Sequence, residues 1–188
     1  MKAITIHQPW ASLIAHGYKR FETRGWRTNY RGPIAIHAGQ KIDSEAVRML
    51  ATEYTRIWRD ISPLPKGCIV AVTELVDCLM VSNWGRSISN WSANGTPVLH
   101  GKDEDIFLDT NDMEYRFGDY TPGRYAWELA NVRRLPEPIP ARGRQGLWNW
   151  EPHDDWKCVV CKEFVVGGGL CEDCIEQETE IAMDLGLI

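Results

Sequence analysis

One segment, Cys68–Leu79, constrains the fold of this chain more than any other. It is dense in β-branched and apolar residues and contains neither glycine nor proline. This composition is typical of a β-strand that packs within a sheet. Because side chains alternate along a strand, one face is predicted to carry Val70, Val72, Glu74, Val76 and Cys78. The segment is therefore predicted to be a strand of a central sheet. Glu74 on a valine face requires a cationic partner, a retained proton or a place where the strand reaches solvent.

Shorter elements of both kinds surround this strand. Pro9 suits the start of a short helix and Gly17 suits its end. Residues 82–123 are expected to be mostly loop. In chain order, the predicted elements are a strand at Ala3–His7, a helix at Trp10–His16, a strand at Ile34–His37, one longer helix from Asp43 or Ser44 to Ile61, and a strand at Tyr125–Leu135 that leads into a proline-rich connector. The sequence therefore predicts an α+β fold.

The charge is unevenly distributed along the chain. The net charge is -5, yet residues 1–60 hold ten Lys and Arg against five Asp and Glu, and residues 151–188 hold two against ten. A local cationic region suits a small or short anionic ligand better than a long nucleic-acid duplex. We find no apolar run of membrane-spanning length and no secretory signal, so the expected location is the cytoplasm, with no membrane partner.

Basic and aromatic residues alternate between Gly17 and Trp26. Lys19, Arg20 and Arg24 lie close to Glu22, and tryptophans flank the run at positions 10 and 26. A nucleotide is bound by such a combination, because cations hold its phosphate and flat rings stack on its base.

Several motifs in this region resemble the ASCH domain, a branch of the PUA-like superfamily. The similar segments are His7–Ile14, Gly17–Trp26, Tyr30–Pro33, Ile36–Ala38, Gly123–Leu129 and Gly146–Trp148, and together they cover roughly residues 1–150. The resemblance implies a small, mostly antiparallel PUA-like β-barrel with flanking helices. It also implies a cleft between the barrel and the first helix that binds RNA, DNA or a modified nucleoside.

The same resemblance supplies an enzymatic alternative. Some small members hydrolyse the amide of N4-acetylcytidine with a lysine, a threonine three residues later and a glutamate. Lys19 matches the lysine, Glu22 occupies the threonine position, and Glu74 is a candidate from its place in the strand. The candidate catalytic residues of a nucleoside hydrolase or ribonuclease are therefore Lys19, Glu22 and Glu74. A purely structural ion-pair network of the same residues is the alternative.

The candidate ligand-binding residues combine the motif positions with the basic and aromatic pattern. Trp26 would stack on a base, and Arg27 and Arg31 would contact phosphate. Trp10 is equally consistent with a core position, and a lone strand histidine such as His37 is more often a hydrogen-bonded core residue than a catalyst. The full set is Gln8, Trp10, Arg24, Trp26, Arg27, Tyr30, Arg31 and His37.

The last part of the chain, residues 151–188, is predicted to be a separate zinc-binding unit after the 1–150 domain. Two Cys-x-x-Cys pairs present four thiolates, at Cys158, Cys161, Cys171 and Cys174. Four thiolates form a closed structural zinc (Zn2+) site. Two disulfides or a redox pair are the alternatives. The acidic, helix-prone segment after them is expected to dock a protein partner or to fold back on the basic domain, which gives an adaptor as a further alternative function.

Overall fold

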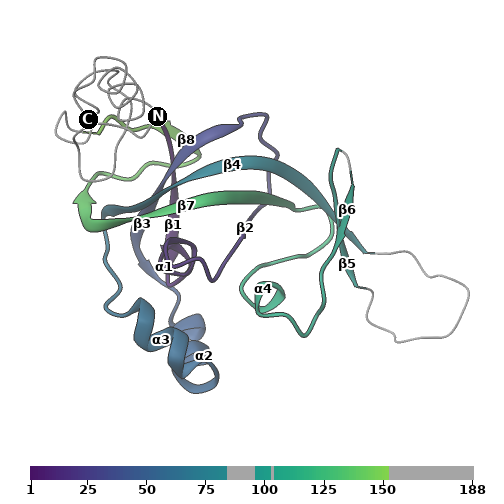
Figure 1. Cartoon of the computed structure of the whole chain (residues 1–188), viewed down its shortest axis with the longest axis horizontal. Helices are drawn as coiled ribbons and strands as arrows, with labels where there is room; N and C mark the ends of the chain where they lie inside the picture. The colour runs from purple at the N-terminus through teal and green to yellow at the C-terminus, as the bar shows by residue number, and fades with distance from the viewer. Residues whose placement is uncertain (84–95, 103, 153–188) are drawn as a thin grey trace, which may run out of the picture.

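A computed structural model of the protein describes residues 1–83, 96–102 and 104–152 (Figure 1). The predicted α+β class is confirmed. The elements in chain order are β1 (Lys2–Gln8), α1 (Trp10–Ala15), β2 (Phe21–Arg24), β3 (Gly32–Ile42), α2 (Ser44–Glu53), α3 (Thr55–Ile61), β4 (Cys68–Asn83), β5 (Pro97–His100), β6 (Asp105–Phe107), α4 (Met113–Arg116), β7 (Tyr125–Pro140) and β8 (Leu147–Asn149).

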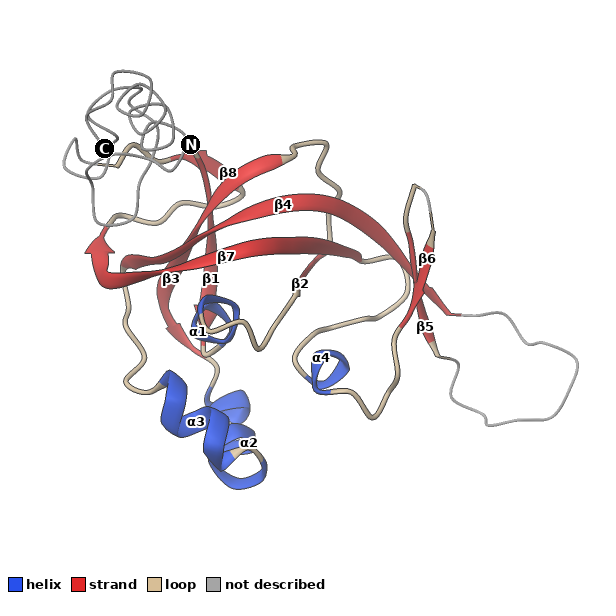
Figure 2. Ribbon diagram, in the orientation of Figure 1, coloured by secondary structure: helices blue, strands red, loops and turns tan. Residues whose placement is uncertain are grey.

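All eight strands belong to one sheet, which Figure 2 shows in red. Its order is β2-β7-β4-β3-β1-β8, and β5 and β6 extend the sheet from the far end of β4. The pair β1–β3 is parallel and the other pairings in the described part of the chain are antiparallel. The sheet is not closed, because β2 and β8 do not pair. Instead, the guanidinium of Arg24 in β2 donates to the Thr5 carbonyl of β1 at 2.9 Å.

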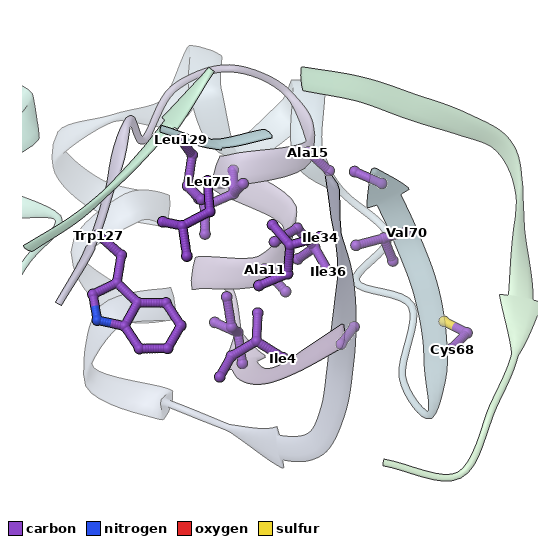
Figure 3. Close-up of a cluster of buried hydrophobic side chains, with 14 of the residues drawn as sticks. Ile4, Ala11, Ala15, Ile34, Ile36, Cys68, Val70, Leu75, Trp127 and Leu129 are labelled. Carbon is purple, nitrogen blue, oxygen red and sulfur yellow. The ribbon is translucent and has the colours of Figure 1, made fainter. Parts of the chain in front are cut away.

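The main core lies between α1 and the long strands (Figure 3). Trp127 of β7 is fully buried and contributes the largest side chain. Tyr125 and Leu129 pack on the same cluster, as the alternation in β7 predicts. Ala11, Ile14 and Ala15 of α1 lie in this cluster too, and the small side chains of Ala11 and Ala15 let the helix approach the sheet. The core therefore fixes the position of α1 and of the loop that follows it.

The predicted face of β4 is wrong in detail. The pairing of β4 with β7 shifts register between Val72 and Glu74 and again between Leu75 and Asp77. Across the second shift β4 advances by two residues and β7 by one, so β4 carries an extra residue there, and the side chains after it move to the opposite face. As a result, Cys78 is buried in the main core with Leu75, whereas Val76, predicted on the same face as Cys78, is 41% exposed.

Three other predictions need correction. The single helix expected up to Ile61 is two helices, α2 and α3, which break at Tyr54, whose ring packs on Phe117 with centroids 5.4 Å apart. The proline-rich connector is the continuation of β7, where prolines are tolerated because β2 pairs only with residues 125–128 and leaves one edge free of a ladder. The expected loop contains β5, β6 and α4.

Candidate functional site

A polar cavity of about 380 Å³ lies where β1, the start of α1 and β2 meet the segment after α4. Four predicted site residues line it together, namely Lys19, Glu22, Arg24 and Trp10. The remaining lining residues are Thr5, Ile6, His7, Thr23, Asp43, Arg116, Phe117, Gly118, Asp119 and Arg124. Ligand-binding cavities have volumes of about 300–1,000 Å³, so this one has the size of a site for a small molecule.

Lys19 is the buried cation of this cavity. It lies in the turn between α1 and β2, is 2% exposed, and its Nζ donates to the carbonyl of Phe21. Burial lowers the pKa of the Lys19 ammonium, and the neighbouring Arg24 acts in the same direction. Glu22 and Glu114 oppose this shift because they favour the charged amine. The pKa of Lys19 is therefore below its ordinary value, so this amine loses its proton more readily than the amine of an exposed lysine.

Glu22 and Arg24 form an ion pair on β2. Their side chains point the same way because they are two residues apart on a strand. Arg24 Nη2 lies 3.0 Å from Glu22 Oε1, and the side chains are 25% and 10% exposed. The Nε of Arg24 has no hydrogen-bond partner among the described residues. This Nε is itself buried. Glu22 and Thr5 both contact Nη2, and the side chain, which is 25% exposed, lines the cavity.

The segment around α4 forms a wall that the sequence pattern did not predict. The Glu114 carboxylate accepts from the backbone N–H groups of Arg20 at 2.6 Å and Phe21 at 3.1 Å, and from the Tyr120 hydroxyl at 3.0 Å. Glu114 thereby fixes the backbone directly after Lys19. Asp112 caps α4 through the Glu114 N–H at 3.2 Å, and this aspartate was the one local signal for the helix.

The α4 segment also brings two more arginines to the cavity. Arg116 pairs with Glu53 at 3.3 Å, and Arg124 pairs with Asp119 at 3.2 Å. Together with Arg24 they place three guanidinium groups around one cavity.

The other predicted residues lie elsewhere. Gln8 is buried and structural, since its side chain donates to the Pro65 carbonyl at 2.7 Å and accepts from the Ser12 N–H at 3.1 Å. Trp26 packs edge-on against Trp127 with ring centroids 4.6 Å apart.

Near Trp26, the side chains of residues 27–31 also lie outside the cavity lining. Arg31 pairs with Asp77 at 2.7 Å, and the Tyr30 hydroxyl donates to the Pro33 carbonyl. Arg27 is exposed.

Glu74 and His37 are separated from Lys19. Glu74 accepts from Asn131 Nδ2 at 2.8 Å and lines a different pocket with Met1 and Arg133. His37 is 2% exposed, and its Nε2 lies 3.0 Å from the Ala141 carbonyl. Neither residue lines the cavity that contains Lys19.

A second polar constellation connects β4, β5 and β6. Ser82 Oγ lies 2.6 Å from His100 Nε2, and His100 Nδ1 lies 2.9 Å from Asp105 Oδ1. This order of groups is that of a hydrolase triad. However, Ser82 lies within a strand, the His100 and Asp105 side chains are 38% and 46% exposed, and none of the three lines the cavity described above. We interpret them as a cross-strand network that holds the three strands together.

Metal binding falls largely outside what the structure describes. In the described part of the chain, no group of three or more His, Cys, Asp or Glu side chains could hold a metal ion. The four cysteines predicted to bind zinc lie outside the described residues. Cys68 and Cys78 are buried thiols whose pKa is raised by burial. Within the same part of the chain, no helix has the length and apolar character needed to cross a bilayer.

Comparison with known proteins supports the resemblance. The chain is 38% identical over 81 residues to human Activating signal cointegrator 1, and 37% identical over 81 residues to the mouse protein of that name. Each match covers 40% of this chain and 14% of the relative's length. The model of the ASCH domain family matches residues 4–139, a span that includes every element from α1 to α4 and most of β1 and β7. The chain therefore belongs to the ASCH domain family.

Proposed function

We propose that this protein binds RNA, or a modified nucleotide, in the cavity between β1, α1, β2 and the α4 segment. The observation that carries the proposal is the convergence of Arg24, Arg116 and Arg124 on one cavity that also contains a tryptophan, a buried lysine and a buried glutamate. Membership of the ASCH family supports it, because the family resemblance implies nucleic-acid or nucleoside ligands for a cleft in this place.

Each group has a defined task in this proposal. Guanidinium groups bind phosphate oxygens through paired N–H donors, and the side chains of Arg24, Arg116 and Arg124 all line the cavity. The Trp10 indole offers a face for base stacking. Glu22 and Thr23 offer an acceptor and a hydroxyl for the hydrogen-bonding edge of a base. The acidic Asp43 and Asp119 limit the total positive charge, which favours a short single strand over a duplex.

The test is equilibrium binding of a fluorescein-labelled ten-nucleotide single-stranded RNA, followed by anisotropy. We expect Arg24→Gln and Arg116→Ala each to weaken binding by about tenfold or more, because each removes one phosphate contact. The matched control is Arg134→Gln, an exposed arginine of β7 that lies outside the cavity lining. Wild-type affinity in both cavity variants would overturn the proposal. Thermal unfolding of each variant separates lost binding from lost folding, and Arg116 is the safer position because its side chain is 49% exposed.

A second candidate function, hydrolysis of a modified nucleoside, is favoured by the environment of Lys19. A lysine whose pKa is lowered by burial can act as a general base or nucleophile near neutral pH. Glu22 is the carboxylate that lines the cavity with it, whereas Glu74 lies in another pocket. The test is chromatographic detection of product from a panel that includes N4-acetylcytidine. Product formed by the wild type and not by Lys19→Ala would establish the enzyme, and RNA binding without product from any substrate favours the binding function.

A further inference from the structure

The loop that connects β7 to β8, residues 141–146, borders the cavity. Thr5, one of the residues that line the cavity, donates from its hydroxyl to the carbonyl of Arg144 at 2.9 Å. At the other end of the loop, the Ala141 N–H donates to the Gly67 carbonyl at 3.0 Å. The strand β8 pairs with β1 only from Lys2 to Ile4, so the loop meets β1 at Thr5, where Arg24 also binds the backbone. The loop and the cavity therefore share one edge of β1.

His37 and Gly143 hold this loop in place. The His37 ring lies under the loop with its Nε2 3.0 Å from the Ala141 carbonyl. A Cβ atom at position 143 would lie 2.7 Å from His37 Nδ1 and 2.9 Å from Thr5 Oγ1, so the close approach requires glycine. The loop is thus pre-organised, which reduces the ordering cost of binding. His37 is a positioning residue here, because it is too buried to contact a ligand itself.

The loop offers positive charge directly beside the cavity. Arg142 and Arg144 are exposed, and neither forms a salt bridge with another described residue. A neighbouring groove along α2 shares Trp10, Asp43 and Arg116 with the cavity. That groove is lined by the carboxylates of Asp43, Glu45 and Glu53 and by the guanidinium groups of Arg48 and Arg116, so its charge is net negative and it attracts phosphate less than the loop does.

We propose that the ligand is a single-stranded polynucleotide, rather than a free nucleoside, and that its phosphates leave the cavity past Thr5 and pass over Arg142 and Arg144. This inference rests on the proposed function, since it requires one nucleotide of the strand to occupy the cavity. The chain then combines a cavity for one base with a rigid basic loop for the neighbouring phosphates. Phosphate contacts of this kind add affinity and salt dependence without sequence preference.

The test compares two double variants of the full chain, Arg142→Ala/Arg144→Ala and Arg56→Ala/Arg59→Ala. The second is the matched control, because it removes the same charge from exposed positions of α3. Binding of labelled ten-nucleotide RNA and DNA of the same sequence is measured between 50 and 200 mM salt, conditions over which phosphate contacts weaken strongly. We expect the loop variant to lose about tenfold in affinity for at least one of the two strands. We also expect its slope of log K against log salt to fall by about 1.4, since each single-strand phosphate contact contributes about 0.7.

The cavity variant Arg116→Ala, measured in the same series, separates the two proposals. If Arg116→Ala weakens binding and the loop variant matches its control in affinity and slope, the strand path is refuted and the cavity function stands. If Arg116→Ala and Arg24→Gln both bind like the wild type, the cavity function fails, and the strand path fails with it. The affinities of the wild type for the RNA and for the DNA strand then show which of the two nucleic acids the protein binds more tightly.

Discussion

Substitution of Gly143 by alanine tests the packing of the 141–146 loop on His37. The added Cβ would lie 2.7 Å from His37 Nδ1 and 2.9 Å from Thr5 Oγ1, whereas non-bonded heavy atoms pack at about 3.5–4.0 Å. The ring or the loop must therefore move by about 1 Å. Overpacking of this kind costs about 1–3 kcal/mol. A displaced loop also weakens the bonds that join Ala141 to His37 and Thr5 to Arg144, at about 1 kcal/mol each.

We therefore expect Gly143→Ala to lower the free energy of unfolding by about 2–3 kcal/mol. The decisive comparison is made in a His37→Ala background, where the imidazole that meets the new Cβ is absent. There, Gly143→Ala is expected to cost less than about 1 kcal/mol, because the contact with Thr5 Oγ1 alone remains.

The measurement is urea-induced unfolding of the wild type, both single variants and the double variant. The coupling energy between positions 37 and 143 should be about 1.5 kcal/mol or more. Independent sites deviate from additivity by only about 0.3–0.5 kcal/mol. Additive effects of the two substitutions would refute the reasoning, because they would mean that the loop does not rest on His37. Gly25→Ala is the control, since a Cβ at position 25 meets nothing within 4 Å.

Three further predictions follow from the same geometry and from the sequence. Burial lowers the pKa of His37 in the folded protein, so the unfolded chain binds the proton more readily and stability should fall as the pH drops below about 6.5. Urea unfolding midpoints measured from pH 8 to 5 should show this fall, and the fall should be smaller in His37→Gln. Glu22→Ala leaves Arg24 without its carboxylate and should lower the free energy of unfolding by about 2–3 kcal/mol, whereas Glu53→Ala, which removes an exposed pair with Arg116, should lower it by about 0–1 kcal/mol. Equal losses in denaturant unfolding would contradict the role of burial. The full chain should contain one zinc ion by elemental analysis and lose it in Cys171→Ser, and a wild-type protein purified without zinc would contradict the four-thiolate prediction.

The sequence predicted the elements whose signals are local. The strand at β1, the short helix α1 with Gly17 after it, and the face shared by Tyr125, Trp127 and Leu129 were all found from periodicity and end signals. The patterns failed where pairing with another strand sets the direction of the side chains. The register shift between Leu75 and Asp77 of β4 depends on its pairing with β7. Because alternation alone does not include this shift, it placed Val76 and Cys78 on the same face, although Val76 is exposed and Cys78 is buried.

The prolines after Leu135 posed the same difficulty. Locally they indicate a connector, yet β7 continues through them because only one of its edges needs backbone donors along that stretch.

The candidate site divides in the same way. Trp10, Lys19, Glu22 and Arg24 could be predicted together because they lie within fifteen residues of each other, and a helix, a turn and a short strand place them around one point. Glu74 shares their chemistry but lies in another pocket with Met1 and Arg133, because it belongs to β4 and not to the segment that surrounds the cavity.

The sequence by itself determined the membership of the ASCH family and the basic and aromatic half of the cavity, and it supplies the four cysteines from which zinc binding is predicted. Tertiary structure alone decided that Arg116 and Arg124 complete the cavity, that Glu114 holds the Lys19 turn, and that the 141–146 loop lies beside Thr5. The physical reason is the separation along the chain. Helix and strand signals act over a few residues, whereas these contacts join residues about a hundred positions apart and form only when burial of the core brings β7 and β8 back to β1 and β2.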